Sequence, residues 1–301
     1  MSGKLKETRE RITSVKSTQQ ITKAMKMVSA AKLRKAQQAI TDLRPYAQRL
    51  NKIMVNILSN VEGEAGSSFS TVRDIEKMAV VVVTSNRGLA GAFNTNVCKK
   101  TLRLMENYQS ELSAGKVDVI CIGKKGYDFL KSRLPQVNFK MENVGLMLDL
   151  SFENIATVSR GLMDAFTLGE YDKVYVVYSQ FRNAAVQDPI SAQFLPVPKL
   201  QGTKEPGEEE SNIKADYIFE PSKNELLEQL IPSILETSFH SYVLDINAGE
   251  HGARMTAMAK ATENANELLK ELKITYNKAR QEAITNEILE IVGGAAALED
   301  G

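Results

Sequence analysis

Apolar residues at both ends of the chain recur at alternating spacings of four and three, the heptad pattern of a left-handed coiled coil. Because two such stretches can pair, we predict that the terminal helices form a long antiparallel coiled coil. The N-terminal pattern runs through Ile21, Met25, Val28, Lys32, Lys35, Ala39, Leu43, Tyr46, Leu50, Ile53 and Ile57. The C-terminal pattern runs through Leu244, Ala248, His251, Met255, Met258, Thr262, Ala265, Leu269, Leu272, Tyr276, Ala279 and Ala283.

The ends of these helices also leave signals in the sequence. The first helix is predicted from about residue 2 to residue 60, which at 1.5 Å per residue is about 85–90 Å. The last helix begins with a capping box, in which Ser222 is the N-cap and Glu225 is the third helical residue. Pro232 is expected to kink or interrupt it. Beyond this proline the pattern continues for about 90 Å, so we predict two helices of similar length.

Short apolar runs in the middle of the chain are typical of strands buried on both faces of a sheet. They alternate with helical stretches, and this order favours a small, mostly parallel sheet. We predict strands at residues 78–84, 117–123, 173–178, 190–198 and 216–219, and helices near residues 92–113, 124–133 and 151–168. The predicted fold class is therefore α/β, a coiled coil plus a Rossmann-like domain. Its three parts are residues 1–60, 75–220 and 222–301.

Charge is distributed unevenly, although the net charge of the chain is only +1. Residues 1–52 carry thirteen Lys and Arg against three acids, a net charge of +10, which leaves −9 for the rest. No acidic residue stands between Arg11 and Ile40. A scattered charge run is usually a solvated face, but one this long favours an acidic partner: nucleic acid, anionic lipid or an acidic protein surface.

Several classes of protein are disfavoured. No apolar run approaches the roughly 18–20 residues that span a bilayer, and the N-terminus lacks the apolar core of a secretory signal. Cys98 and Cys121 lack metal-ligand spacing, so we expect buried thiols in a reducing compartment. His240 and His251 have no triad or metal-site arrangement around them, and we expect each to be packed or partly solvated. We predict no catalytic residue, cofactor or metal.

Residues 84–91 (TSNRGLAG) follow a predicted strand and precede a helix, where nucleotide-binding loops lie. The stretch lacks the lysine of a P-loop and a full G-x-G-x-x-G, so a glycine turn that packs strand against helix is the favoured interpretation. Two other functions stay open: a nucleotide-binding α/β protein and a basic coiled-coil protein that binds nucleic acid. Residues 293–298 (GGAAAL) are either a frayed end or a smooth apolar tip.

Two long stretches resemble the signatures of the ATP synthase gamma subunit, namely residues 12–32 (ITSVKSTQQITKAMKMVSAAK) and residues 277–297 (NKARQEAITNEILEIVGGAAA). Residues 84–91, 216–221 and 254–258 resemble it too, so the likeness spans essentially the whole chain. The resemblance implies a non-catalytic central rotor shaft of a proton-translocating F-type ATP synthase. Such a shaft couples rotation of the c-ring to three catalytic sites in a ring of alpha and beta subunits.

The resemblance also implies which residues contact partners. Contacts with the ring of alpha and beta subunits are expected at Lys23, Met25, Lys26, Arg254, Gln281, Thr285 and Glu287. Tyr217 is expected in the foot that meets the c-ring and the epsilon subunit.

The sequence differs from that family at two places and lacks a leader, and these features refine what the resemblance implies. Asn286 stands where many relatives have Gln, and residues 201–212 lack the paired cysteines of the chloroplast branch. The absence of a leader before Lys4 favours a bacterial protein. We expect it on the cytoplasmic side of the inner membrane, held there through the c-ring.

Overall fold

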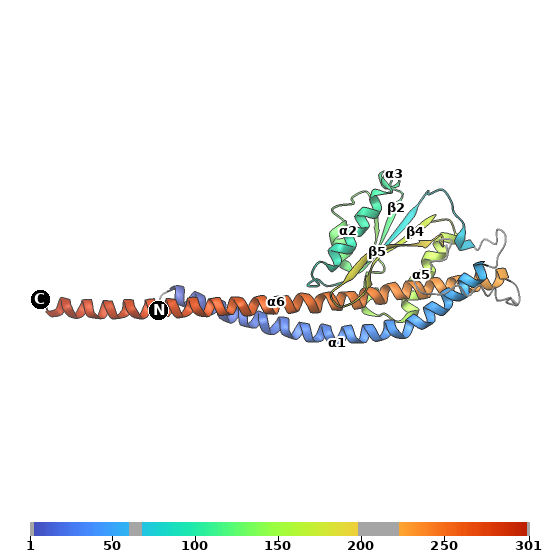
Figure 1. Ribbon diagram of the computed structural model, residues 1–301. Helices are drawn as coiled ribbons and strands as arrows, with labels where there is room; N and C mark the ends of the chain where they lie inside the picture. The colour runs from blue at the N-terminus through green and yellow to red at the C-terminus, as the bar shows by residue number, and fades with distance from the viewer. Residues whose placement is uncertain (1–2, 60–67, 198–222, 300–301) are drawn as a thin grey trace. The chain divides into compact units, whose positions relative to one another are not determined.

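The computed structural model describes residues 3–59, 68–197 and 223–299 (Figure 1). Two compact units make up the chain: unit 1 comprises Met1–Ala30 and Arg254–Gly301, and unit 2 comprises Ala31–Ala253. Helices α1 (Gly3–Ser59) and α6 (Lys223–Glu299) each contribute to both units. The predicted boundaries at residues 60 and 222 lie outside the described residues, so the division into three parts stays a prediction.

Unit 1 is an antiparallel pair of helices. The Thr262 hydroxyl donates to the Thr22 hydroxyl at 2.8 Å, and the Gln19 amide donates to the Asn266 side chain. Further along, the Lys4 ammonium lies 3.8 Å from a Glu282 carboxylate oxygen. The residue numbers of the partners on α6 increase as those on α1 decrease, which confirms the predicted antiparallel pairing.

The predicted contact positions are confirmed for α6 but are partly wrong for α1. Every predicted position on α6 is buried or half-buried. On α1 the buried positions lie mostly one residue later; they are Leu5, Thr8, Thr22, Ser29, Leu33, Ala36, Ile40 and Leu50. Ile21 and Val28 are 59% and 57% exposed, and Lys32, Lys35 and Tyr46 are exposed too. The observed register keeps two lysines out of the interface, whereas small residues such as Ser29 and Ala36 fill it.

The lengths of the two helices differ from expectation. Helix α1 has 57 residues and α6 has 77, so the prediction of similar length is wrong. Helix α6 also continues through Pro232 without interruption, because Ile231 and Leu235 on either side are held in the hydrophobic core. Ser222 and the side chain of Glu225 lie outside the described residues, so the capping box stays a prediction.

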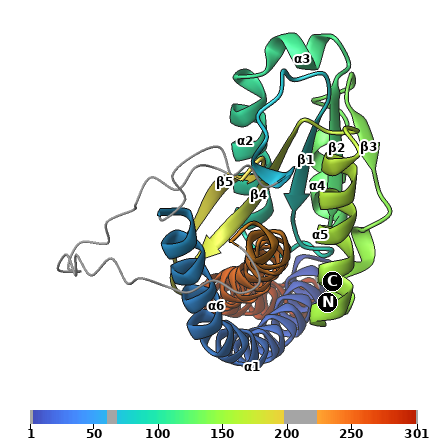
Figure 2. The same ribbon diagram turned by 90° about the vertical axis from the view of Figure 1, so that its right-hand side faces the viewer.

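The sheet of unit 2 has five strands in the order β3-β2-β1-β4-β5 (Figure 2). The strands are β1 (Met78–Val83), β2 (Val117–Ile122), β3 (Asn138–Lys140), β4 (Lys173–Phe181) and β5 (Gln187–Leu195). The first four are parallel and β5 runs antiparallel to β4, which confirms a mostly parallel sheet. Strand β5 begins three residues before the predicted position and forms a hairpin with β4. The predicted strand at residues 216–219 lies outside the described residues.

Helical segments connect the strands. They are η1 (Ser68–Ser70), α2 (Phe93–Glu106), α3 (Gln109–Ser113), α4 (Lys124–Leu130), η2 (Val144–Leu148) and α5 (Phe152–Thr167). The single helix predicted at residues 92–113 is broken into α2 and α3 at Tyr108, whose backbone is not helical. Its hydroxyl lies 2.8 Å from that of Tyr175 on β4, so a tertiary contact accompanies the break.

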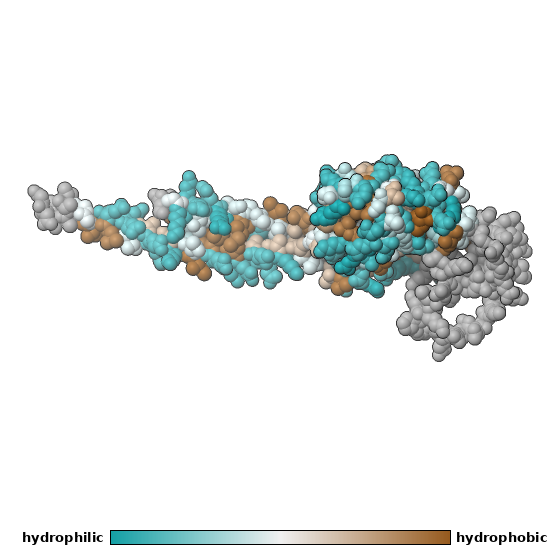
Figure 3. Space-filling view, turned by 90° about the horizontal axis from the view of Figure 1, so that it is seen from above, coloured by the Kyte–Doolittle hydropathy of each residue, from teal (hydrophilic) through white to brown (hydrophobic). Residues whose placement is uncertain are grey.

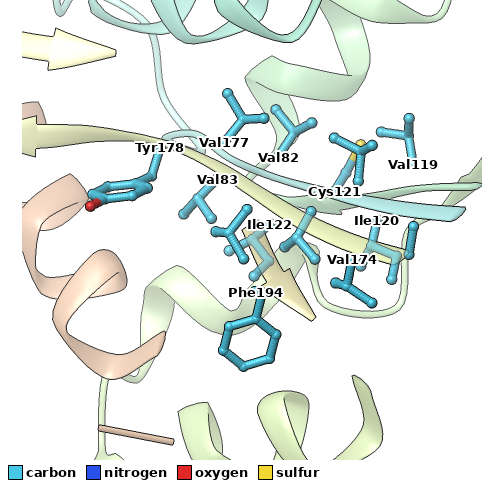
Figure 4. Close-up of a cluster of buried hydrophobic side chains, with 14 of the residues drawn as sticks. Val82, Val83, Val119, Ile120, Cys121, Ile122, Val174, Val177, Tyr178 and Phe194 are labelled. Atoms are coloured by element: carbon cyan, nitrogen blue, oxygen red, sulfur yellow. The ribbon is translucent and has the colours of Figure 1, made fainter. Parts of the chain in front are cut away.

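The core of unit 2 includes one face of α6. Strands β1 and β2 are buried along their whole length, as their continuous apolar runs predict (Figure 4). Phe239 of α6 packs against Phe194 of β5 with ring centroids 5.6 Å apart, and Tyr242 stacks on Tyr178 of β4 at 4.4 Å. Helix α6 is thus an integral part of the α/β unit, because its side chains complete the core.

Candidate partner-binding surfaces

One exposed surface of unit 1 surrounds the predicted contact residues of α1. Lys23 and Lys26 are exposed and lie one helical turn apart, whereas Met25 is half-buried. Three apolar side chains in the same two turns of α1 are 57–61% exposed. We define the basic collar as Ile21, Lys23, Lys26, Met27 and Val28. Sequence reasoning missed its apolar members because it assigned Ile21 and Val28 to the helix interface; the alternative heptad register would have found them.

A second exposed surface lies near the end of α6. Five large apolar side chains there are 48–70% exposed. We define the apolar tip as Ile284, Ile288, Leu289, Ile291 and Val292. Within unit 1, α6 extends beyond the N-terminal end of α1, and hydrophobic surface is visible near that end (Figures 1 and 3). Exposed apolar groups that are neighbours on one helix mark interaction sites in proteins.

The remaining predicted contact residues lie at different depths. Gln281, Thr285 and Glu287 are exposed near the apolar tip, and the Thr285 hydroxyl donates to the Gln281 carbonyl at 3.0 Å. Arg254 is only 9% exposed and makes contacts within the chain. Tyr217 lies outside the described residues. Gly293 and Gly294 are helical, with open space where a side chain would be. The sequence placed a smooth apolar tip at residues 293–298, whereas the exposed apolar surface in the structure already includes the larger side chains at residues 284–292.

The basic collar and the apolar tip are separate surfaces. Lys4 of α1 meets Glu282, and 22 residues along one helix separate Lys4 from Lys26, about 33 Å at 1.5 Å per residue. The predicted contact residues therefore form two groups on one shaft. An arrangement of this kind can contact partners at two levels.

The glycine-containing turn of unit 2 uses its polar groups internally. The Ser85 N–H donates to the Asn94 side-chain oxygen at 2.9 Å, and the Ser85 hydroxyl donates to the Arg87 carbonyl at 2.7 Å. Leu89 and Gly91 have positive φ angles of 63° and 57°, as a tight turn requires. These contacts support the interpretation as a packing turn, because a phosphate-binding loop directs free N–H groups at its ligand.

The buried titratable groups of unit 2 also bear on chemistry. Cys98 and Cys121 are fully buried, as predicted, and this burial raises the pKa of both thiols to about 12, which makes them poor nucleophiles. His240 is half-buried with its ring edge-on to Phe152, and His251 is half-buried. Among the described residues, no three His, Cys, Asp or Glu side chains converge to hold a metal. Nor does any helix of the described ranges combine the length and apolarity needed to cross a membrane.

Comparison with known proteins gives a consistent result. The family model described as ATP synthase matches residues 4–298. The ATP synthase gamma chain of Cytophaga hutchinsonii is 52% identical over 297 residues, which cover 98% of this chain and 99% of the relative. That of Flavobacterium psychrophilum is 52% identical with the same coverage.

Solved structures share the fold. A chain of the Euglena gracilis mitochondrial ATP synthase, solved as an OSCP/F1/c-ring assembly in rotational state 3, superimposes with a TM-score of 0.63. It is 22% identical, and the match covers 100% of this chain and 96% of that one. A chain of the rotor of the same enzyme gives a TM-score of 0.60. From the family model and the identity to curated relatives, this chain belongs to the ATP synthase gamma chain family.

Proposed function

We propose that this chain is the central rotor shaft of a proton-translocating F-type ATP synthase. One observation carries the proposal beyond family membership: an antiparallel coiled coil presents a basic collar and, separately, an apolar tip that begins beyond Glu282, whose level on the axis is about 33 Å from Lys26. A shaft that turns inside a ring needs contact surfaces at more than one level. Solved relatives of the same fold belong to structures titled as central stalk and rotor.

The mechanism follows from the asymmetry of the shaft. Each of three catalytic sites in the surrounding alpha and beta subunits meets a different face of it. A site's conformational equilibrium shifts only by the difference in contact free energy between its states. Rotation of the c-ring turns the shaft and exchanges these contacts in sequence, so substrate binding and product release alternate. The chain itself is non-catalytic, and it acts by exchanging contacts.

Roles for individual residues belong to the same proposal. Lys23, Met25 and Lys26 contact an acidic surface of a beta subunit, which suits the exposed lysines of the basic collar. Arg254, Gln281, Thr285 and Glu287 contact the alpha and beta ring. Tyr217 lies in the foot that meets the c-ring and the epsilon subunit. This chain lies on the cytoplasmic side of a bacterial inner membrane and is held there through the c-ring.

Co-purification tests the proposal directly. The full chain is expressed with the alpha and beta subunits, only the alpha subunit carries an affinity tag, and the purified material is assayed for ATP hydrolysis. We expect one gamma-type chain in each active complex. Quantitative elution of the chain apart from active alpha and beta subunits would contradict the proposal. Salt-sensitive retention of the free chain on DNA would instead favour the nucleic-acid alternative.

A further inference from the structure

The turn between β4 and β5 is a rigid projection. We define the hairpin tip as residues 182–187. The Asn183 side-chain oxygen accepts the N–H groups of Ala185 and Val186, each at 2.9 Å. The Gln187 amide donates to the Asn183 and Ala184 carbonyls at 3.2 and 2.9 Å. These four side-chain hydrogen bonds, with backbone N–H groups of Arg182 and Asn183 that donate to the Val186 carbonyl, fix the shape of this turn.

Two glycines of α6 form a depression that faces this projection, and we call them the glycine notch. A side-chain carbon placed on Gly252 would lie 3.1 Å from the Ala184 Cα and 3.2 Å from its carbonyl oxygen. A carbon on Gly249 would lie 2.8 Å from the Phe93 ring and 3.5 Å from Gln187. Glycine is a poor helix former, so its presence at two buried positions of a helix indicates a packing requirement.

A buried carboxylate one turn earlier engages the same hairpin. Asp245 is 7% exposed, and the backbone of Phe181, next to the hairpin tip, acts to lower its pKa. Arg182 at the hairpin tip and Arg44 of α1 are the cations whose charges act on it, and the hydroxyl groups of Tyr178 and Tyr242 also lie within its electrostatic range. Asp245, Gly249 and Gly252 are four and three residues apart, so they share one face of α6.

We propose that the hairpin tip and the glycine notch form the joint that prevents α6 from rotating about its own axis against the sheet of unit 2. The inference rests on the proposed rotor function, in which torque must pass between this sheet and a continuous helix. Smooth apolar packing resists separation but permits slippage about the helix axis. A rigid projection in a depression resists slippage because the backbones of Gly252 and Ala184 would collide.

The decisive experiment uses the assembled ATP synthase in lipid vesicles, and compares the protons pumped with the ATP hydrolysed. Gly252→Leu fills the notch. Gly161→Leu is the matched control, since it also replaces a helical glycine of unit 2 but has nothing within 4 Å of the added carbon. We expect the ratio of pumping to hydrolysis to fall at least threefold in Gly252→Leu and to stay unchanged in Gly161→Leu.

A second variant keeps the test decisive if Gly252→Leu does not assemble. Asn183→Ala removes two of the hydrogen bonds that hold the hairpin tip without touching α6. We expect faster hydrogen exchange at residues 182–187 in the free chain and a lower pumping ratio in the complex. A normal pumping ratio in either assembled variant would overturn the joint while leaving the rotor function intact. Failure of the unaltered chain to assemble would instead overturn the rotor function itself.

Discussion

At the scale of single residues, the buried Asp245 and the half-buried His240 of α6 are titratable side chains with opposite responses to pH. Burial raises the pKa of Asp245 from 3.8 to about 6, although Arg44, the Phe181 N–H and Arg182 act to lower it. Burial lowers the pKa of His240 below 6.5, and a hydrogen bond to the Leu150 backbone acts in the opposite direction. Each shift links protonation to folding.

For Asp245 the raised pKa means that the native chain binds more protons than the unfolded chain between about pH 3.8 and pH 6. Its contribution to stability is therefore fully present below about pH 3.8 and is lost as the pH rises through about 6. We expect the free energy of unfolding of Asp245→Asn, relative to the unaltered chain, to increase between pH 4 and pH 7. The total change is at most about 3 kcal/mol, from the two-unit shift in pKa.

Urea unfolding of the free chain at several pH values measures this difference. Asp74→Asn is a suitable control, because Asp74 is exposed on the same unit. A difference between Asp245→Asn and the unaltered chain that stays constant from pH 4 to pH 7 would show that Asp245 does not titrate in this range in the folded protein.

The contribution of His240 to stability depends on pH in the opposite direction. Its Nδ1 atom is buried with no hydrogen-bond partner, so protonation would create a buried N–H without an acceptor. With a pKa below its ordinary value in the fold, His240 contributes stability above about pH 6.5 that is lost as the pH falls. We expect His240→Gln to lose less thermal stability than the unaltered chain between pH 7 and pH 5. An NMR titration of the imidazole that gives a pKa of 6.5 or higher would refute this account.

At the scale of elements, the sequence predicts the strands better than the face of α1. The strand starting at Met78 is located correctly, because a short unbroken apolar run is typical of a strand that is buried on both faces of a sheet. Helix α1 carries apolar residues on more than one stripe, and Ile21 and Val28 belong to an exposed one. One sequence cannot distinguish apolar residues that pack within the chain from those available to a partner, since both have helical periodicity.

The hairpin tip and the glycine notch also lay beyond sequence reasoning. Gly249 and Gly252 leave no periodic signal, because the partner that explains them is some sixty residues away in the chain. The turn around Asn183 has side-chain hydrogen bonds that its composition permits but does not specify. Such contacts between distant elements become visible only when the sheet and α6 are placed together.

The corrected register of α1 makes a direct prediction for adjacent residues. Ala36 is 3% exposed, whereas Lys35 is exposed. We expect Ala36→Asp to destabilise unit 2 by about 3 kcal/mol or more, because it buries a charge without a partner. Lys35→Asp serves as the matched control, with an expected change within about 0.5 kcal/mol. Thermal unfolding of both variants measures the difference, and equal destabilisation would support the register first inferred from the sequence.

At the scale of the whole molecule, the proposed function depends on charge presented by the basic collar. Lys26→Glu reverses one of its two exposed charges, and we expect lower proton pumping per ATP hydrolysed in the assembled complex. Lys35→Glu is the control, because it makes the same change in the same acid-free stretch of α1, between Arg11 and Ile40, but outside the collar. Normal coupling in Lys26→Glu, with coupling also normal in the control, would remove Lys26 from the set of contact residues.

The unequal lengths of α1 and α6 have a consequence for chains that never reach the complex. Helix α1 begins at Gly3, near the level of Glu282, so the last turns of α6 have no partner within the described part of unit 1. Most helical stability in proteins comes from tertiary packing of one face, which these turns lack. We therefore expect these turns to open readily in the free chain and to offer a protease an apolar, cleavable end. Enclosure by partner subunits would protect them, so we expect limited proteolysis to cut this end of α6 faster in the free chain than in the assembled complex.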